Sequence, residues 1–151
     1  NHHYVKEEWV ETALQWPGMM VSTDALPAID TSIPTNPNIA GTFSRLLGHY
    51  VREREVLSLS DALARSSLYQ AQWMEQASPV FKNKGRIQRG ADADIVIFDA
   101  QTIAANAVYG DPYLKPTGML HVLVAGELVV QNGQPEEGPA PGQKLLGSVS
   151  Q

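Results

Sequence analysis

The sequence of 151 residues contains no cysteine. Without thiols the chain can form no disulfide bond and has no cysteine nucleophile, which fits a cytoplasmic protein. Basic residues are also scarce: the chain has 11 Lys and Arg and 16 Asp and Glu. The basic residues form no cluster. The resulting formal net charge of −5 argues against a nucleic-acid partner.

Long apolar runs are missing as well. No stretch approaches the roughly 20 apolar residues of a membrane-spanning helix. The first residues, which include His2 and His3, do not resemble a signal peptide, and we expect no membrane partner. Adjacent histidines point in different directions, so we interpret this pair as a solvated end or a tag remnant and not as a metal site.

The most informative stretch covers residues 85–99 and reads Gly-Arg-Ile-Gln-Arg-Gly-Ala-Asp-Ala-Asp-Ile-Val-Ile-Phe-Asp. Gly85 begins a turn, and Gly90 with its small neighbour leaves room for a close approach of the backbone. The apolar run at residues 95–98 is typical of a strand that is buried on both faces. Asp99 ends this strand.

A β-hairpin is expected later in the chain, over residues 119–133. Two apolar runs meet there at Ala125-Gly126, and Asn132-Gly133 forms another tight turn. We therefore place a boundary near residues 77–85, between a helical half and a β half.

The first half of the chain has the apolar spacing of helices. It predicts a helix over residues 5–15, a second over 41–53, and then a pair of short helices. The first of the pair, around residues 59–63, is capped by Ser58, and a break at Ser66-Ser67 separates it from the other at residues 68–74. The second helix carries one apolar face, made by Phe43, Leu46, Leu47, Tyr50 and Val51.

A candidate catalytic residue follows a short apolar run. Met-Met-Val at residues 19–21 predicts a buried strand, and Ser22, Thr23 and Asp24 come at its C-terminal end. In (β/α)8 barrels, catalytic residues lie at the C-terminal ends of the strands. Aspartate is also common after strands because its side chain caps turns. From the residues alone, both interpretations of Asp24 stay open.

Three blocks, in this order, resemble the metal-dependent amidohydrolases and, more narrowly, the N-acyl-D-amino-acid deacylases (D-aminoacylases). The first is Ser-Thr-Asp-Ala at residues 22–25, similar to a Ser-x-Asp-type motif of the last barrel strand. The second is Gly-Thr-Phe-Ser-Arg-Leu-Leu-Gly-His-Tyr-Val-Arg-Glu at residues 41–53. The third is the 85–99 stretch. Tyr69 stands where the family often has proline, which is a modest departure.

The resemblance implies an α/β plus β fold. Residues 1–80 would form the last unit of a (β/α)8 barrel with its helices, and residues 81–151 part of the small amidohydrolase β-sandwich. Such a barrel takes about 250 residues, so we expect the chain to be part of a longer enzyme. Alone it would leave apolar surface and sheet edges open, and we expect self-association or docking onto the remainder of the enzyme.

The same resemblance implies hydrolysis of the amide bond of N-acyl-D-amino acids by a metal-activated water, with zinc in the intact enzyme. Asp24 would be the catalytic aspartate, which takes a proton from that water and passes it to the leaving amine, and it is also a candidate metal ligand. The family's His-x-His ligands are absent from this sequence. Since a catalytic zinc site needs about three protein ligands, we expect this chain alone to bind no metal and to be inactive.

Two alternatives belong to other classes. One is an amidohydrolase that acts on cyclic amides, similar to dihydroorotases or hydantoinases, although the block at residues 41–53 argues against it. The other is a non-catalytic binding or scaffold module. His49 lies among charged residues of an expected helix and His121 within an expected strand, so we interpret His49 as a solvated or supporting residue and His121 as structural.

Overall fold

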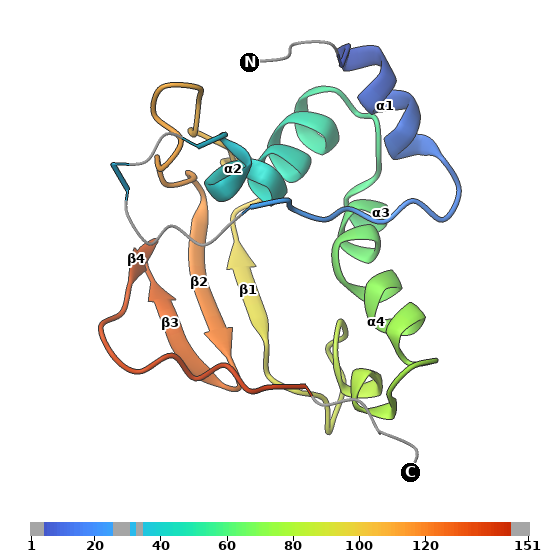
Figure 1. Ribbon diagram of the computed structural model, residues 1–151, viewed down its shortest axis with the longest axis vertical. Coiled ribbons are helices and arrows are strands. Elements are labelled where there is room, and N and C mark those ends of the chain that lie inside the picture. Colours follow the sequence, from blue (N-terminus) through green and yellow to red (C-terminus); the bar gives the residue numbers. More distant parts are fainter. Residues whose placement is uncertain (1–4, 26–30, 33–34, 146–151) are drawn as a thin grey trace.

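The computed structural model describes residues 5–25, 31–32 and 35–145. Helices come first along the chain, and an antiparallel sheet follows (Figure 1). The helical segments are α1 (Glu7–Gln15), α2 (Asn38–Arg45), η1 (Leu46–Glu53), α3 (Leu59–Leu63), η2 (Ala64–Leu68), α4 (Tyr69–Met74) and η3 (Pro79–Asn83). The strands are β1 (Ile95–Phe98), β2 (Met119–Val124), β3 (Glu127–Gln131) and β4 (Gln134–Pro135).

The second predicted helix is present, and the width of its turns changes halfway. The segment α2 is α-helical, and η1 continues it with π-type turns. As predicted, the apolar face turns inward, because Leu46, Leu47 and Tyr50 are all buried. Phe43, at the start of this face, is 39 % exposed and lies outside the core.

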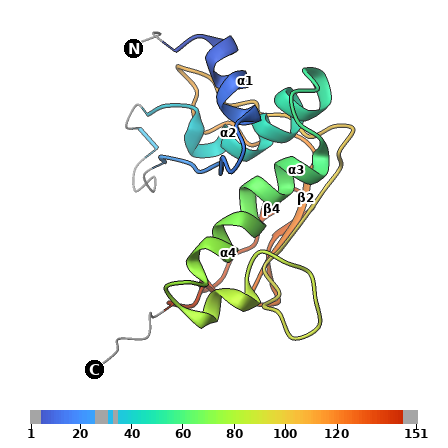
Figure 2. The same ribbon diagram turned by 90° about the vertical axis from the view of Figure 1, so that its right-hand side faces the viewer.

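The predicted break at Ser66-Ser67 is wrong. In Figure 2, α3, η2 and α4 follow one another as one helical rod. Ser58 caps the rod as predicted, because its Oγ accepts the N–H of Asp61 at 3.1 Å. The rod continues past the serines through the π-type turns of η2, and the Ser66 hydroxyl donates to the Ala62 carbonyl at 2.7 Å. The Ser66 hydroxyl thus has a hydrogen-bond partner within the helix.

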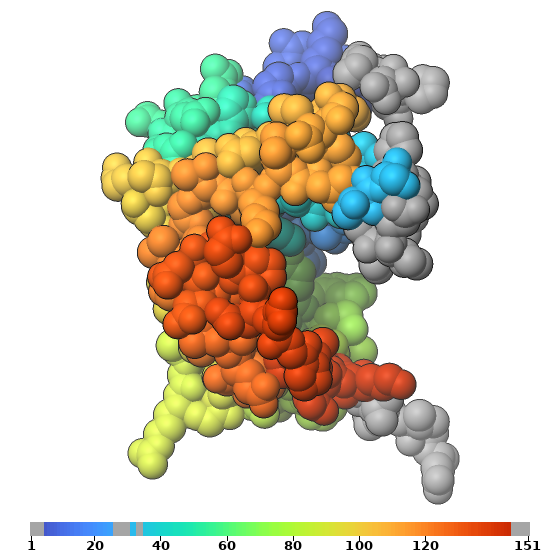
Figure 3. Space-filling view, turned by 90° about the vertical axis from the view of Figure 1, so that its left-hand side faces the viewer, coloured from blue at the N-terminus to red at the C-terminus, as the bar shows by residue number. Residues whose placement is uncertain are grey.

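The strands form one four-stranded antiparallel sheet in the order β1-β2-β3-β4. The predicted hairpin is confirmed, with φ values of 51° and 85° at Ala125 and Gly126, and the next turn has 50° and 74° at Asn132 and Gly133. Consecutive residues with positive φ form type I′ turns, whose twist matches that of the flanking strands. Figure 3 shows β3 and β4 (orange to red) at the molecular surface.

Strand β1 forms where the sequence predicts it, but it is not buried on both faces. Val96 is 52 % exposed and Ile97 is 44 % exposed. The described residues form a single sheet layer, whereas a strand is buried on both faces only when each face packs against another layer.

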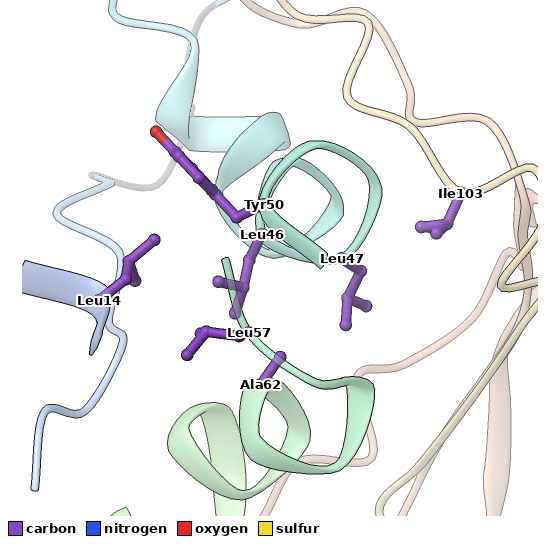
Figure 4. Close-up of a cluster of buried hydrophobic side chains, with 7 residues drawn as sticks. All are labelled: Leu14, Leu46, Leu47, Tyr50, Leu57, Ala62 and Ile103. Atoms are coloured by element: carbon purple, nitrogen blue, oxygen red, sulfur yellow. The ribbon is translucent and has the colours of Figure 1, made fainter. Parts of the chain in front are cut away.

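The core lies between α1, η1 and the first turn of the helical rod (Figure 4). Ile103, from the loop between β1 and β2, reaches the same cluster and is 1 % exposed. Gly48 makes this contact possible, because a Cβ at this position would lie 2.4 Å from the Ile103 carbonyl oxygen. This junction joins the helical half to the sheet.

The close backbone approach in the 85–99 stretch lies at a different glycine from the one predicted. The close approach occurs at Gly85, where a Cβ would lie 2.8 Å from the Ser67 carbonyl oxygen and 2.9 Å from the Ala71 Cβ. A Cβ on Gly90 would have no atom within 4 Å, so the prediction of a close approach there is wrong. Its φ of 88° is the reason that glycine is favoured.

Candidate active site

Asp24 lies in the segment that follows α1, and this segment is not a strand. Residues 19–21 are half-buried, but they pair with no strand among the described residues. The predicted strand is therefore wrong for this chain. A barrel strand forms by pairing with two neighbours, and the described sheet is built entirely from residues after Asp94.

The helical rod supplies the hydrogen-bond partners that neighbouring strands would otherwise supply. The Val21 N–H donates to the Arg65 carbonyl at 2.8 Å, and the Gln70 Nε2 donates to the Val21 carbonyl at 2.8 Å. The Arg65 Nη1 donates to the carbonyls of Trp16 at 2.9 Å and Met19 at 3.2 Å. Two residues of the rod thus hold the backbone that leads to Asp24.

The π-type turns of η2 explain why the Arg65 carbonyl is available. The N–H of Tyr69 donates to Ala64, five residues back, and not to Arg65, four residues back. The Arg65 carbonyl then accepts the Val21 N–H and the Gln70 side chain, the latter at 2.6 Å. Widened turns re-aim backbone groups in this way and are frequent at functional sites.

The residue before Asp24 is held by α2. The Thr23 hydroxyl donates to the Asn38 carbonyl at 3.2 Å. The Thr42 hydroxyl lies 3.2 Å from the Thr23 hydroxyl and 2.9 Å from the same Asn38 carbonyl. Thr42 belongs to the second family-like block, so the structure brings two of the three blocks together at this point.

Asp24 itself is exposed, and no hydrogen bond or ion pair joins its carboxylate to another described residue. No group of three metal-ligating side chains comes together in the described ranges. Asp24 offers one carboxylate, whereas a catalytic zinc site takes about three protein ligands. The described residues therefore do not form a zinc site by themselves. His2 and His3 lie outside the described residues.

The histidines inside the described ranges have supporting contacts. His49 Nε2 lies 3.2 Å from Glu7 Oε1, and its Nδ1 lies 3.0 Å from Glu53 Oε2. His121 Nδ1 accepts the N–H of Asn132 at 3.5 Å. These contacts fit the interpretation of His49 as a supporting residue and of His121 as a structural one.

The ion pairs that join α1 to α2 and η1 were not predicted. Arg45 Nη2 lies 3.1 Å from Glu7 Oε1, the same oxygen that faces His49. Burial would raise the pKa of Glu7, but the Tyr50 hydroxyl and the positive charge of Arg45 lower it below its ordinary value. The sequence did carry a signal, because Arg45, His49 and Glu53 repeat at a spacing of four residues, which places them on one helix face.

A cleft of about 950 Å³ opens between α4 and the turn before β1. Gln70 and Met74 line it on one side and Lys84 and Asp94 on the other. Asp24 does not belong to its lining. This cleft therefore lies apart from the candidate catalytic carboxylate.

Comparison with known proteins places these features in a family. The profile of the Amidohydrolase family matches residues 19–130, from the start of the Asp24 segment into β3. The chain belongs to the amidohydrolase family. Within the part of this amidohydrolase that the structure describes, no helix is long and apolar enough to cross a membrane.

Curated relatives of this amidohydrolase come from Alcaligenes xylosoxydans xylosoxydans. An N-acyl-D-glutamate deacylase is 36 % identical over 88 % of this chain and 26 % of its own length. A D-aminoacylase is 30 % identical over 81 % of this chain and 24 % of its own length. The amidohydrolase chain thus spans about a quarter of the length of these relatives.

Solved structures agree with the sequence matches. A D-aminoacylase crystal structure superposes with a TM-score of 0.76 at 29 % identity, covering 87 % of this chain and 26 % of that one. The N-acyl-D-glutamate deacylase of Bordetella bronchiseptica, complexed with zinc and a phosphonate inhibitor, superposes with a TM-score of 0.74 at 35 % identity. The match covers 87 % of this chain and 27 % of that one. These matches confirm the predicted resemblance to N-acyl-D-amino-acid deacylases.

Proposed function

We propose that this chain is the C-terminal part of an enzyme that hydrolyses N-acyl-D-amino acids to a carboxylic acid and a free D-amino acid. The observation that carries the proposal is that relatives with this activity in their names match 81 % and 88 % of the chain, at up to 36 % identity. The narrower match also favours this activity over hydrolysis of cyclic amides.

Asp24 is the proposed catalytic residue. Its carboxylate accepts a proton from the water that attacks the amide carbon, and later gives that proton to the nitrogen of the leaving amine, so that the C–N bond breaks without a free anion of the amine. Proton transfer by a positioned carboxylate contributes about 10²-fold to 10⁴-fold to such rates. The exposed side chain of Asp24 supports this role, because a proton-transfer group has to reach the substrate.

Zinc is the proposed cofactor of the intact enzyme. One fold neighbour is complexed with zinc, and another is described as having a binuclear metal centre. In this chain the described residues bring no three metal-ligating side chains together, so the remaining ligands would come from outside the described residues. Asp24 is the proposed contribution of this segment to that centre.

The proposed architecture divides the chain in two. Residues 1–80 would complete the catalytic barrel, and residues 81–151 would form part of the β-sandwich. The single described sheet layer and the exposed side chains of Val96 and Ile97 support docking of this half onto the remainder of the enzyme, or self-association of the chain alone. A cytoplasmic location belongs to the same proposal.

The test replaces Asp24 in the full-length enzyme and measures the hydrolysis of N-acetyl-D-glutamate, with N-acetyl-L-glutamate and a cyclic amide as comparison substrates. For Asp24→Asn we expect kcat to fall by about 10²-fold to 10⁴-fold. Asp111→Asn, in the exposed loop between β1 and β2, is the matched control and should keep full activity. Preferential hydrolysis of the cyclic amide, or an active Asp24→Asn enzyme, would contradict the proposal.

A further inference from the structure

The Asp24 segment is anchored at two places, and the two anchors differ in their distance from the carboxylate. Arg65 and Gln70 hold the backbone at Val21, three residues before Asp24. The hydroxyl pair of Thr23 and Thr42 holds the residue directly before it. Among the described contacts, the threonine pair is therefore the anchor next to the candidate catalytic group.

The threonine pair is a connected unit. Both hydroxyls reach the carbonyl of Asn38 in the first turn of α2, at 3.2 Å from Thr23 and 2.9 Å from Thr42, and they lie 3.2 Å from each other. The Thr23 hydroxyl donates to the carbonyl, so its oxygen is an acceptor for Thr42. The single hydrogen of Thr42 has two acceptors within reach, this oxygen at 3.2 Å and the Asn38 carbonyl at 2.9 Å, and it bonds one of them at a time.

The pair also restricts motion. Threonine is β-branched and stiff about χ1, so a hydroxyl fixed against α2 fixes the backbone that bears it. The Cα of Asp24 lies one peptide unit away, about 3.8 Å along the chain. A helix whose own face is buried through Leu46 and Leu47 provides a rigid base for this contact.

We propose that Thr42 is a positioning residue for Asp24 and acts through the hydroxyl of Thr23. The inference rests on the proposed function, because it assigns to α2 the task of orienting the carboxylate that moves the proton. In this role Thr42 acts through Thr23 and not by contact with the substrate. Its loss should affect the rate of the chemical step and leave substrate binding unchanged, since a displaced catalytic group costs rate in the transition state.

The experiment uses the full-length enzyme and N-acetyl-D-glutamate. For Thr42→Val we expect kcat to fall by about 10-fold to 100-fold with an unchanged KM, because misplacement of a catalytic group by about 1 Å can cost about 10²-fold. Thr42→Ser keeps the hydroxyl and should restore most of the rate. Thr23→Val should lower kcat similarly, and the double variant should be little worse than either single one, because both changes break the same contact.

Thr12 offers a matched control. Its hydroxyl donates to the Glu8 carbonyl at 2.8 Å, the same spacing of four residues as between Thr42 and Asn38, but on the exposed side of α1. Thr12→Val should lower the melting temperature about as much as Thr42→Val and leave kcat unchanged. This comparison separates a loss of helix stability from a loss of positioning.

The outcomes distinguish the two proposals. If Asp24→Asn is inactive and Thr42→Val keeps full kcat, the positioning role is wrong and the proposed function stands. If Thr42→Val loses activity but Thr42→Ser does not recover it, or if KM changes in place of kcat, the positioning role is also wrong. An active Asp24→Asn enzyme would contradict the proposed function itself.

Discussion

The sheet and the Asp24 segment are held in place by opposite means. In the sheet, β2, β3 and β4 are joined by two-residue turns, and their partners are near neighbours in sequence. The Asp24 segment has no strand partner among the described residues, and its contacts with α2 and the helical rod span 15 to 49 positions in sequence. The β2-β3-β4 part of the sheet is thus determined locally, whereas the candidate catalytic segment depends on the helices around it.

The largest expected effect concerns the junction on which both regions depend. A Cβ on Gly48 would lie 2.4 Å from the Ile103 carbonyl oxygen and 3.2 Å from the Ala104 Cα, and backbone atoms cannot easily move away. We expect Gly48→Ala to lower the free energy of unfolding by about 3 kcal/mol. Chemical denaturation followed by circular dichroism would measure the change.

The control for this junction is Gly142→Ala. A Cβ there would meet no atom within 4 Å, and the residue does not have a positive φ. This variant should be as stable as the unmodified chain. Equal stability of the Gly48 and Gly142 variants would show that the two halves do not depend on their contact at Ile103.

A smaller effect on stability is expected from a substitution that removes a hydrogen bond to the Asp24 segment alone. Gln70→Ala removes the donor to the Val21 carbonyl and leaves that half-buried group without its partner. We expect the free energy that holds this segment in place to fall by about 1 to 3 kcal/mol, which is the typical cost of an unsatisfied buried polar group. Hydrogen exchange should quicken at Val21, and exchange at the sheet amides should not change.

Gln72 is the matched control on the same helix, because its side chain is exposed and makes no hydrogen bond within the described residues. Gln72→Ala should therefore leave both the stability and the exchange pattern unchanged. Faster exchange throughout the sheet in the Gln70→Ala variant would contradict the view that the two regions are held independently.

The smallest effect concerns the edge of the sheet at Asp94 and depends on pH. The N–H of Ala125 and, next to it, the ammonium group of Lys84 lower the pKa of Asp94 below its ordinary value. Because the folded-state pKa is lowered, the ionised carboxylate stabilises the fold above the unfolded-state pKa of about 3.9. This stabilisation is lost as the pH falls through the folded-state pKa.

Asp94→Asn should remove this part of the pH dependence between neutral and acid conditions. Thermal melts of the variant and of the unmodified chain, recorded from pH 7 downwards, should converge at the acid end. Asp111→Asn should keep the original profile. A variant profile that runs parallel to the original at every pH would contradict the role of Asp94 in the turn.

Much of the fold followed from local patterns. The cap at Ser58 and the hairpin turn at Ala125-Gly126 lie where the residues predicted them, because each depends on a few neighbours and on the conformations that those residues prefer. The continuity of the helical rod past Ser66 did not follow, because a serine that breaks one helix is satisfied within another by π-type turns.

The sequence by itself determined the family, the positions of most helices and strands, and the candidate carboxylate, Asp24. Only the tertiary structure decided what surrounds that carboxylate. The apolar run at residues 19–21 has the composition of a strand, but a strand requires a partner strand. Here the helical rod forms hydrogen bonds with the backbone of Val21, and α2 forms one with the hydroxyl of Thr23. Hydrogen bonds between residues far apart in the chain follow from the packing of whole elements, which no local pattern encodes.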